Sequence, residues 1–300
     1  CSNGSRCNFL ATSSTRLEEL ITYIQMKSCK ITLLLLLLIS CTSLENESIN
    51  KNITADSGSF IKIPLHNELP VGYKINIQNK KYVVYGLPYV LDDEIITVGN
   101  YKIKVRKKDF GESRIIIDNQ NLVQPKISDR ERASAEYLKV RSIINKVTTQ
   151  FDYNFDFIPP INDVITSNYG KQRFINGSRR NPHKALDIRG GIGTQIIAPK
   201  KGRVVLAEEH FYGGNKLILD HGGGLFTAYS HLSKFAVTKG QIVDQSEIIG
   251  FVGATGRVTG PHLHWEVFLN EESINPELLV ALQNAQDWRK NFFQFDSSFL

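Results

Sequence analysis

Short apolar runs that alternate with polar residues recur along the chain from about residue 58, with turn-forming residues between them. Tyr73-Lys-Ile-Asn-Ile77 and Tyr101-Lys-Ile-Lys-Val105 are examples. Because successive side chains of a strand point to opposite faces, this pattern predicts short strands that are buried on one side. We therefore predict a mainly β protein. Its residues 58–124 are expected to form a small antiparallel β-sandwich as an N-terminal β domain.

A helical pattern interrupts the strands over residues 125–150. Ser128-Asp-Arg-Glu131 has the spacing of a capping box, and it is followed by apolar residues at near-helical intervals, namely Ala135, Leu138, Ile143, Ile144 and Val147. The spacing predicts a helix from about Ser128 to Val147 that connects two domains. In the last segment, 276–300, Asn275-Pro276 can open a second helix over Glu277 to Arg289.

The first 57 residues predict export rather than a core. Met26 precedes two lysines and the apolar run Ile31 to Ile39, an order typical of a secretory signal and shorter than the roughly 20 residues of a spanning helix. We expect translation to start at Met26, so that residues 1–25 are a non-native upstream extension and residues 26–40 a signal peptide.

The end of that signal resembles a bacterial lipobox, Leu38-Ile39-Ser40-Cys41, which implies that Cys41 carries lipid. Ordinary signal cleavage beside an incidental cysteine is the alternative. Cys1, Cys7 and Cys29 would be lost with residues 1–40 and Cys41 would carry lipid, so no disulfide framework remains. The polar residues 41–57 are expected to be a tether. A lipid anchor would hold the protein in the cell envelope, at the outer membrane facing the periplasm if the cell is Gram-negative.

The charge balance restricts the partners. The formal net charge is +6, and without residues 1–40 it is 32 basic minus 28 acidic residues, or +4. So small a surplus suits a protein that works near an anionic polymer. It does not indicate a nucleic-acid partner.

Residues 151–275 are rich in glycine and hold most of the histidines. Histidines two positions apart in a strand project from the same face, so His262 and His264 can address one point. With His183 and Asp187, one of them completes a set of two histidines and one carboxylate, which leaves zinc a fourth position for water. The spacing does not decide which of the two binds metal. Zinc lowers the pKa of bound water from about 15.7 toward 7, and without an HExxH motif an imidazole is the candidate general base.

The ordered motifs from Tyr169 to Asn270 resemble the M23 family of peptidases, the lysostaphin-type or LytM-type domains. The matching residues are Tyr169-Gly170, His183 to Asp187, Gly193-Thr194, Ala198-Pro199, Gly202-Arg-Val204, His221-Gly222, Tyr229-Ser-His231-Leu232, Gly240, Ile249-Gly250, Gly253, Thr255-Gly256 and Gly260-Pro-His-Leu-His-Trp265. One departure is Ala185, where many members of the family have glycine. The resemblance implies an antiparallel β catalytic domain of the lysostaphin type in residues 151–275.

The resemblance also implies roles for the site residues. His183, Asp187 and His264 would bind one zinc ion, and His262 would be the general base. His231 would stabilise the oxyanion or donate a proton to the leaving amine. Two further histidines fall outside these roles. His221 is expected to be structural, and His210 is expected to be exposed.

The substrate that the resemblance implies is peptidoglycan, cut in its cross-links or stem peptides by a zinc metalloendopeptidase. The alternative is a metal-free LytM-type regulator that activates cell-wall amidases, although all ligand positions are filled here. A further hypothesis is intramolecular inhibition, in which the N-terminal domain or the loop from Phe174 to Arg180 covers the site. In that loop, Asn176 could occupy the open metal position.

Overall fold

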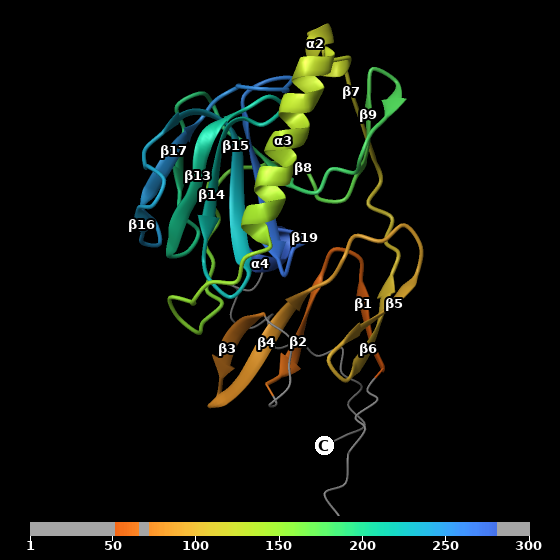
Figure 1. Cartoon of the computed structure of the whole chain (residues 1–300), viewed down its shortest axis with the longest axis vertical. Coiled ribbons are helices and arrows are strands. Elements are labelled where there is room, and N and C mark those ends of the chain that lie inside the picture. Colours follow the sequence, from red (N-terminus) through yellow and green to blue (C-terminus); the bar gives the residue numbers. More distant parts are fainter. Residues whose placement is uncertain (1–51, 66–71, 281–300) are drawn as a thin grey trace, which may run out of the picture. The chain divides into compact units, whose positions relative to one another are not determined.

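The computed structural model describes residues 52–65 and 72–280 (Figure 1). Met26, the signal peptide and Cys41 lie outside these residues, so what was expected of them stays a prediction. Strands far outnumber helices in the described part, which confirms the mainly β fold class. No helix in this part is long and apolar enough to cross a membrane.

The N-terminal residues form two three-stranded sheets, with strand orders β1-β6-β5 and β2-β4-β3. The strands are β1 (Asn52–Asp56), β2 (Phe60–Pro64), β3 (Tyr73–Ile77), β4 (Lys80–Gly86), β5 (Glu94–Val98) and β6 (Tyr101–Arg106). The alternating sequence explains them, because every second residue of β6 is buried, including Ile103 and Val105.

Strand β1 corrects two expectations. It begins at Asn52, inside the segment 41–57 predicted as a tether, and it pairs with β6 in parallel rather than antiparallel. Beyond the strand, the Ser57 amide donates to the Arg106 carbonyl at 2.9 Å, and the Ser57 hydroxyl oxygen accepts from the Val90 amide at 2.8 Å. These backbone partners order the segment despite its polar composition.

The sheet β2-β4-β3 shares an apolar core with the C-terminal part of the chain. Tyr73 lies in the same buried cluster as Trp265 and Val267. Strand β4 approaches the later strands so closely that a Cβ on Gly86 would come within 2.4 Å of the Leu269 carbonyl oxygen. The segment expected to be an N-terminal domain is therefore packed against the later strands.

The C-terminal part is built on a ten-stranded sheet with the central order β16-β13-β14-β15-β18-β11-β8, to which β12, β17 and β19 are added. The strands are β8 (Ile165–Ser167), β11 (Leu186–Arg189), β12 (Gln195–Ile197), β13 (Gly202–His210), β14 (Gly214–Asp220), β15 (Leu225–Phe235), β16 (Ile242–Val243), β17 (Ile248–Val252), β18 (His262–Leu269) and β19 (Glu272–Ile274). Each of their pairings is antiparallel, as predicted. The fully buried side chains of Leu217, Tyr229 and Trp265 lie in its core.

Helix α3 (Ile127–Ile144) lies against the large sheet (Figure 1). Its Ile144 packs with Ile218 and Phe226, and the Lys139 ammonium lies 2.5 Å from a Glu208 carboxylate oxygen on β13. The spacing predicted a helix from about Ser128 to Val147, and α3 lies there. That it connects two domains stays a prediction; its apolar end covers the large sheet. The predicted capping box is not formed, since the N-cap is Lys126 without a side-chain hydrogen bond.

A small sheet of order β10-β9-β7 borders the large one. It consists of β7 (Glu112–Ile115), β9 (Gln172–Ile175) and β10 (Ser178–Arg179), and β7 leads into the short helix α2 (Gln120–Val123). The Asn176 side chain accepts from the Ile117 amide at 2.8 Å and donates to its carbonyl at 3.0 Å. Asn176 therefore holds the β7 segment and does not occupy a metal position.

Two further expectations concern helix α4 and His210. Helix α4 (Glu277–Val280) begins where predicted, and the remainder of that predicted helix lies outside the described residues. His210 is 5% exposed, whereas it was expected to be exposed. It is buried because it ends β13 with its ring beside the Glu208 carboxylate, at 3.1 Å from Nε2.

Candidate metal and hydrolytic site

Antiparallel pairing of β11 with β18 brings distant parts of the sequence together. In this register Asp187 lies directly opposite His264. His183 precedes β11, where its amide donates to the Lys171 carbonyl at 2.8 Å and its carbonyl accepts from the Gly170 amide at 2.7 Å. Ala185, the departure from the family pattern, is fully buried and is not one of the described residues with positive φ. Its methyl group is thus compatible with this backbone.

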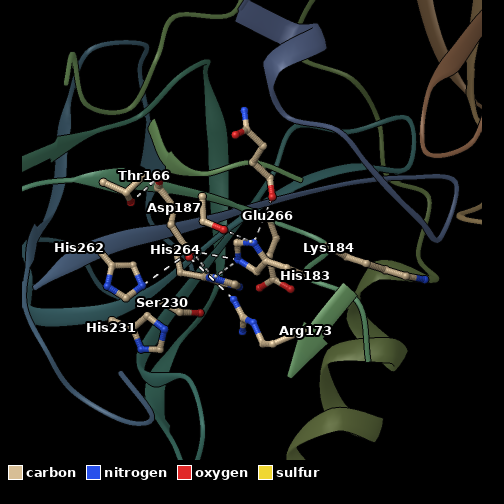
Figure 2. Close-up of polar contacts among 12 residues, drawn as sticks. Thr166, Arg173, His183, Lys184, Asp187, Ser230, His231, His262, His264 and Glu266 are labelled. Atoms are coloured by element: carbon tan, nitrogen blue, oxygen red, sulfur yellow. Dashed lines mark hydrogen bonds and ion pairs between the residues drawn. The ribbon is translucent and has the colours of Figure 1, made fainter. Parts of the chain in front are cut away.

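Three ligand atoms converge at this point (Figure 2). His183 Nε2 lies 3.0 Å from Asp187 Oδ1, and His264 Nδ1 lies 2.8 Å from the same oxygen and 3.2 Å from His183 Nε2. The corners of a tetrahedron around zinc are about 3.3 Å apart for bonds of 2.0–2.1 Å. The triangle is close to that size.

The surroundings of His183 suit a metal-binding histidine. His183 is 2% exposed, and burial lowers its pKa, so the ring is neutral and carries one proton. Its Nδ1 lies 3.3 Å from the Asn168 carbonyl oxygen, which can only accept a hydrogen bond. A metal-binding histidine commonly donates its second ring N–H to such a carbonyl. With the proton on Nδ1, Nε2 would be free to bind a cation.

Asp187 remains ionised in this setting. Burial alone would raise the pKa of its carboxyl, but the contacts with His183 and His264 hold that pKa well below its usual value. The carboxylate is thus available as the anionic ligand of the set.

Two more histidines, His231 and His262, face the cluster from its other side (Figure 2). Their ring centroids lie 5.0 Å apart, and His262 Nε2 lies 3.7 Å from Asp187 Oδ1. Each Nδ1 lies 2.8 Å from a backbone carbonyl oxygen, that of Thr255 for His231 and that of Gly260 for His262. Both Nδ1 atoms must donate to these carbonyls, so both Nε2 atoms are free for proton transfer when the rings are neutral.

Backbone strain places His231. Its φ of 68° lies in the left-handed region, and the adjacent part of β15 is irregular in its pairing with β14. Behind it two loops touch, because a Cβ on Gly256 would lie 2.4 Å from the Gly214 amide nitrogen. Burial lowers the pKa of His231 well below its usual value, and the nearby His264 and His262 lower it further. The ring is therefore neutral near pH 7.

His221, expected to be structural, is fully buried away from this cluster. Its Nδ1 donates to the Lys201 carbonyl at 2.9 Å, and its Nε2 accepts from the Thr227 hydroxyl at 2.8 Å. Burial lowers its pKa to about 4. It belongs to the core rather than to the site.

Several residues that surround the ligands could not be identified from the sequence. Arg173 on β9 reaches the cluster, with its Nη2 3.8 Å from Asp187 Oδ2. Two positions after His264, the Glu266 carboxylate contacts the Lys216 ammonium within the sheet. Burial would raise the pKa of Glu266, but Lys216 lowers it below its usual value, so an anion lies near the ligand histidines. Period-2 spacing places Glu266 and His264 on one face, yet only the three-dimensional pairing brings Arg173 there.

A cavity of about 340 Å³ opens beside the cluster. Asp187, His231, His262 and His264 line it together with residues of β7, β9 and the loop before β18. The arrangement combines a potential metal position, two imidazoles with free nitrogens and room for a ligand.

Comparison with known proteins agrees with this chemistry. Residues 181–276 match the family model of Peptidase family M23. This segment is thus similar to an M23 peptidase domain. The segment contains His183, Asp187, His231, His262 and His264.

Two relatives of the M23 domain come from Vibrio cholerae. The peptidoglycan DD-endopeptidase ShyA is 31% identical over 198 residues, which are 61% of this chain and 46% of ShyA. The peptidoglycan DD-endopeptidase ShyB is 34% identical over 139 residues, which are 45% of this chain and 33% of ShyB. The chain thus spans less than half the length of these curated relatives.

The similarity in structure extends beyond the M23 domain. The crystal structure of a Pseudomonas aeruginosa protein assigned to peptidase M23 has a TM-score of 0.59 and 25% sequence identity. The match covers 78% of this chain and 96% of that chain. More than the segment found by the family model therefore shares its fold with that protein.

Proposed function

We propose that this chain is a zinc metalloendopeptidase that hydrolyses peptide bonds in the cross-links or stem peptides of peptidoglycan. The observation that carries the proposal is the convergence of three ligand atoms within 3.2 Å of one another, beside two imidazoles with free Nε2 atoms. The M23 domain and the names of the relatives support the reaction and the substrate.

In this proposal His183 Nε2, Asp187 Oδ1 and His264 Nδ1 hold one zinc ion. Zinc in such a set activates water and polarises the scissile carbonyl. The Asn168 carbonyl fixes the tautomer of His183.

His262 is the general base in this proposal, because its Nε2 is free and faces the cluster. It accepts a proton from the attacking water while the Gly260 carbonyl keeps the ring oriented. His231 was assigned oxyanion stabilisation or proton donation. Since the neutral ring already uses its only proton on Thr255, His231 can donate from Nε2 only after it has received a second proton.

The rival function is a metal-free regulator of cell-wall amidases. The complete ligand set favours the enzyme, because a regulator has no need for His183, Asp187 and His264 to converge. Zinc content and peptidoglycan digestion together separate the two functions, measured for the unaltered protein and for His264→Ala and His262→Ala.

We expect about one zinc per chain and release of peptide fragments by the unaltered protein. His264→Ala should lose the metal, and His262→Ala should keep it but lose activity. His210→Gln, which removes a buried histidine outside the cluster, is the matched control. A protein that binds no zinc and digests nothing would favour the regulator.

Another part of the chain could restrict substrate access to the site. Intramolecular inhibition is proposed because Glu112 and Ser113 of β7 line the cavity. Faster digestion by Glu112→Ala would support it, and an unchanged rate would contradict it.

We also propose that lipid on Cys41 tethers the protein to a membrane facing the periplasm. Mass spectrometry of the mature N-terminus tests that proposal, and an unmodified cysteine would exclude it.

A further inference from the structure

Basic side chains gather in the wall of the cavity, beyond the five residues already given roles. Lys171, Arg173, Arg189 and Arg257 line it, whereas its acidic residues are Glu112 and the metal ligand Asp187. A cavity beside a cationic metal site would be expected to contain balancing acids. The wall of this cavity instead carries more basic than acidic side chains.

Two of the charged residues are already neutralised by neighbours. The Arg189 guanidinium lies 2.8 Å from the Asp163 carboxylate, and the Glu112 carboxylate lies 2.6 Å from the Arg114 guanidinium. In the described residues, Lys171 and Arg257 make no ion pair with a carboxylate. The unbalanced charge is therefore that of Lys171, Arg173 and Arg257.

Arg173 is the most confined of the three. Its side chain is 20% exposed, and within the described part of the chain its Nε has no hydrogen-bond partner. Among the described residues its carboxylate partner is Asp187, at 3.8 Å, which is longer than the 2.7–2.9 Å of a charge-assisted hydrogen bond. Asp187 is also engaged through Oδ1 with the two ligand histidines. A buried guanidinium with donors to spare is costly unless an anion reaches it.

Arg257 stands in the loop before β18. Its guanidinium carbon lies 4.1 Å from the centre of the Tyr212 ring, and Nη1 makes only a 3.5 Å contact with the Leu122 carbonyl. Burial lowers the pKa of Arg257, and the positive charges of Arg173 and Arg180 act in the same direction. The stacking fixes the plane of the group, and its donors remain available to a ligand.

We infer that Arg173 and Arg257 form a subsite for a carboxylate that the peptide substrate carries next to the scissile bond. The inference rests on the proposed peptidase function and specifies its substrate class. Guanidinium groups suit a planar carboxylate because each offers parallel N–H donors. The carboxylate has two sources, a terminal α-carboxylate after the cut residue or a side-chain carboxylate within a longer peptide.

A purely structural alternative is that Arg173 only orients Asp187. That role would affect zinc binding and every substrate equally. The subsite instead predicts discrimination between substrates with and without the carboxylate. Substrate preference and zinc content therefore separate the two roles.

The test measures binding without turnover, by calorimetry on the zinc-loaded full chain with His262→Ala. The probes are three synthetic versions of one cross-link peptide. The first has both carboxylates next to the scissile bond free, and in the other two the terminal or the side-chain carboxylate is amidated. We expect amidation of the recognised carboxylate to weaken binding roughly tenfold or more, and the sensitive position identifies its source.

Adding Arg173→Gln should reduce that preference to near one while zinc content stays unchanged. Arg257→Gln should reduce it in the same direction and provides a second variant if Arg173→Gln does not fold. Arg173→Lys should retain part of the preference. Arg189→Gln is the matched control, since it removes a cation of the same cavity that is already paired, and it should keep the preference.

Three results would overturn the subsite: no preference in the parent protein, no binding of any peptide, or a preference that survives both glutamine variants. Cleavage by the protein with His262 intact is measured in parallel. If the carboxylate preference is found but nothing is cut, the peptidase proposal fails and the subsite stands. If all three peptides are cut and bound equally, the subsite fails and the peptidase stands.

Discussion

The two sides of the site are built in different ways. On the ligand side, Asp187 and His264 lie opposite each other on paired strands. On the other side, His231 and His262 are held by carbonyls of Thr255 and Gly260, both in the loop before β18. The register of the sheet fixes the first pair. His231 and His262 also stand on strands, β15 and β18, but loop carbonyls direct their rings, and the backbone at His231 is strained.

This difference suggests a division of labour. Strand pairing gives Asp187 and His264 a fixed spacing, and backbone hydrogen bonds to Gly170 and Lys171 hold His183 beside them. Loop carbonyls set only the tautomer and direction of the two outer imidazoles. Substitutions on the ligand side should therefore remove metal and activity together, and those on the loop side should remove activity alone.

The largest effect is expected for Asp187→Asn, which keeps the shape of the side chain and removes its charge. Loss of the anionic ligand should lower zinc affinity and digestion rate by more than the roughly 10- to 100-fold typical of a change in an outer-shell partner. Zinc titration and release of peptide fragments measure the two. Full zinc content in this variant would contradict the assignment of Asp187 as a ligand.

A smaller effect, confined to the rate, is expected for His262→Gln. Removing a general base slows hydrolysis by roughly 10²- to 10⁴-fold. Zinc content should stay near that of the unaltered protein, because the ligands on the paired strands are intact. Loss of zinc from this variant would contradict the separation of metal binding from the outer imidazoles.

The sequence predicted the ligand side better than its surroundings. His183, Asp187 and the His262/His264 pair stand at short spacings that a strand or a turn converts directly into proximity. By contrast, Arg173 reaches Asp187 only because β9 lies beside the large sheet and pairs with β7, a contact across distant segments. Spacing carries no trace of such a contact.

Errors in the other expectations have a similar cause. His210 was expected to be exposed, but it is buried at the end of β13 with its ring beside the Glu208 carboxylate. The tether was drawn too long because the polar composition near Asn52 gave no hint that β6 would offer a parallel partner.

Gly256→Ala tests whether the loop before β18 positions His231 through the Thr255 carbonyl. With φ at 75° and a new Cβ 2.4 Å from the Gly214 amide nitrogen, the loop must shift and carry the Thr255 carbonyl away from His231. A displacement near 1 Å costs roughly 100-fold in rate. Zinc content should be retained.

The control for that prediction is Gly240→Ala. Gly240 also has a positive φ, of 97°, but a Cβ there would have no atom within 4 Å. This variant should lose about 1 kcal/mol of stability through backbone strain and keep its rate. Equal rates for the two alanine variants would show that the loop contact does not position His231.

The smallest expected effect concerns the pH dependence of stability. It asks whether the core histidine, His221, or the histidines of the site cause the loss of stability in acid. Its pKa is about 4 in the folded protein and about 6.5 when unfolded, so between these values the unfolded chain binds the proton and the folded chain does not. Stability should therefore fall by about 3 kcal/mol as the pH drops from about 6.5 to about 4. Replacing His221 by Asn should remove that part of the slope, whatever its constant cost at neutral pH. Chemical denaturation of both proteins measures it, with a chelator present so that zinc release adds nothing. Equal slopes would mean that the site histidines, and not His221, govern the acid sensitivity of the fold.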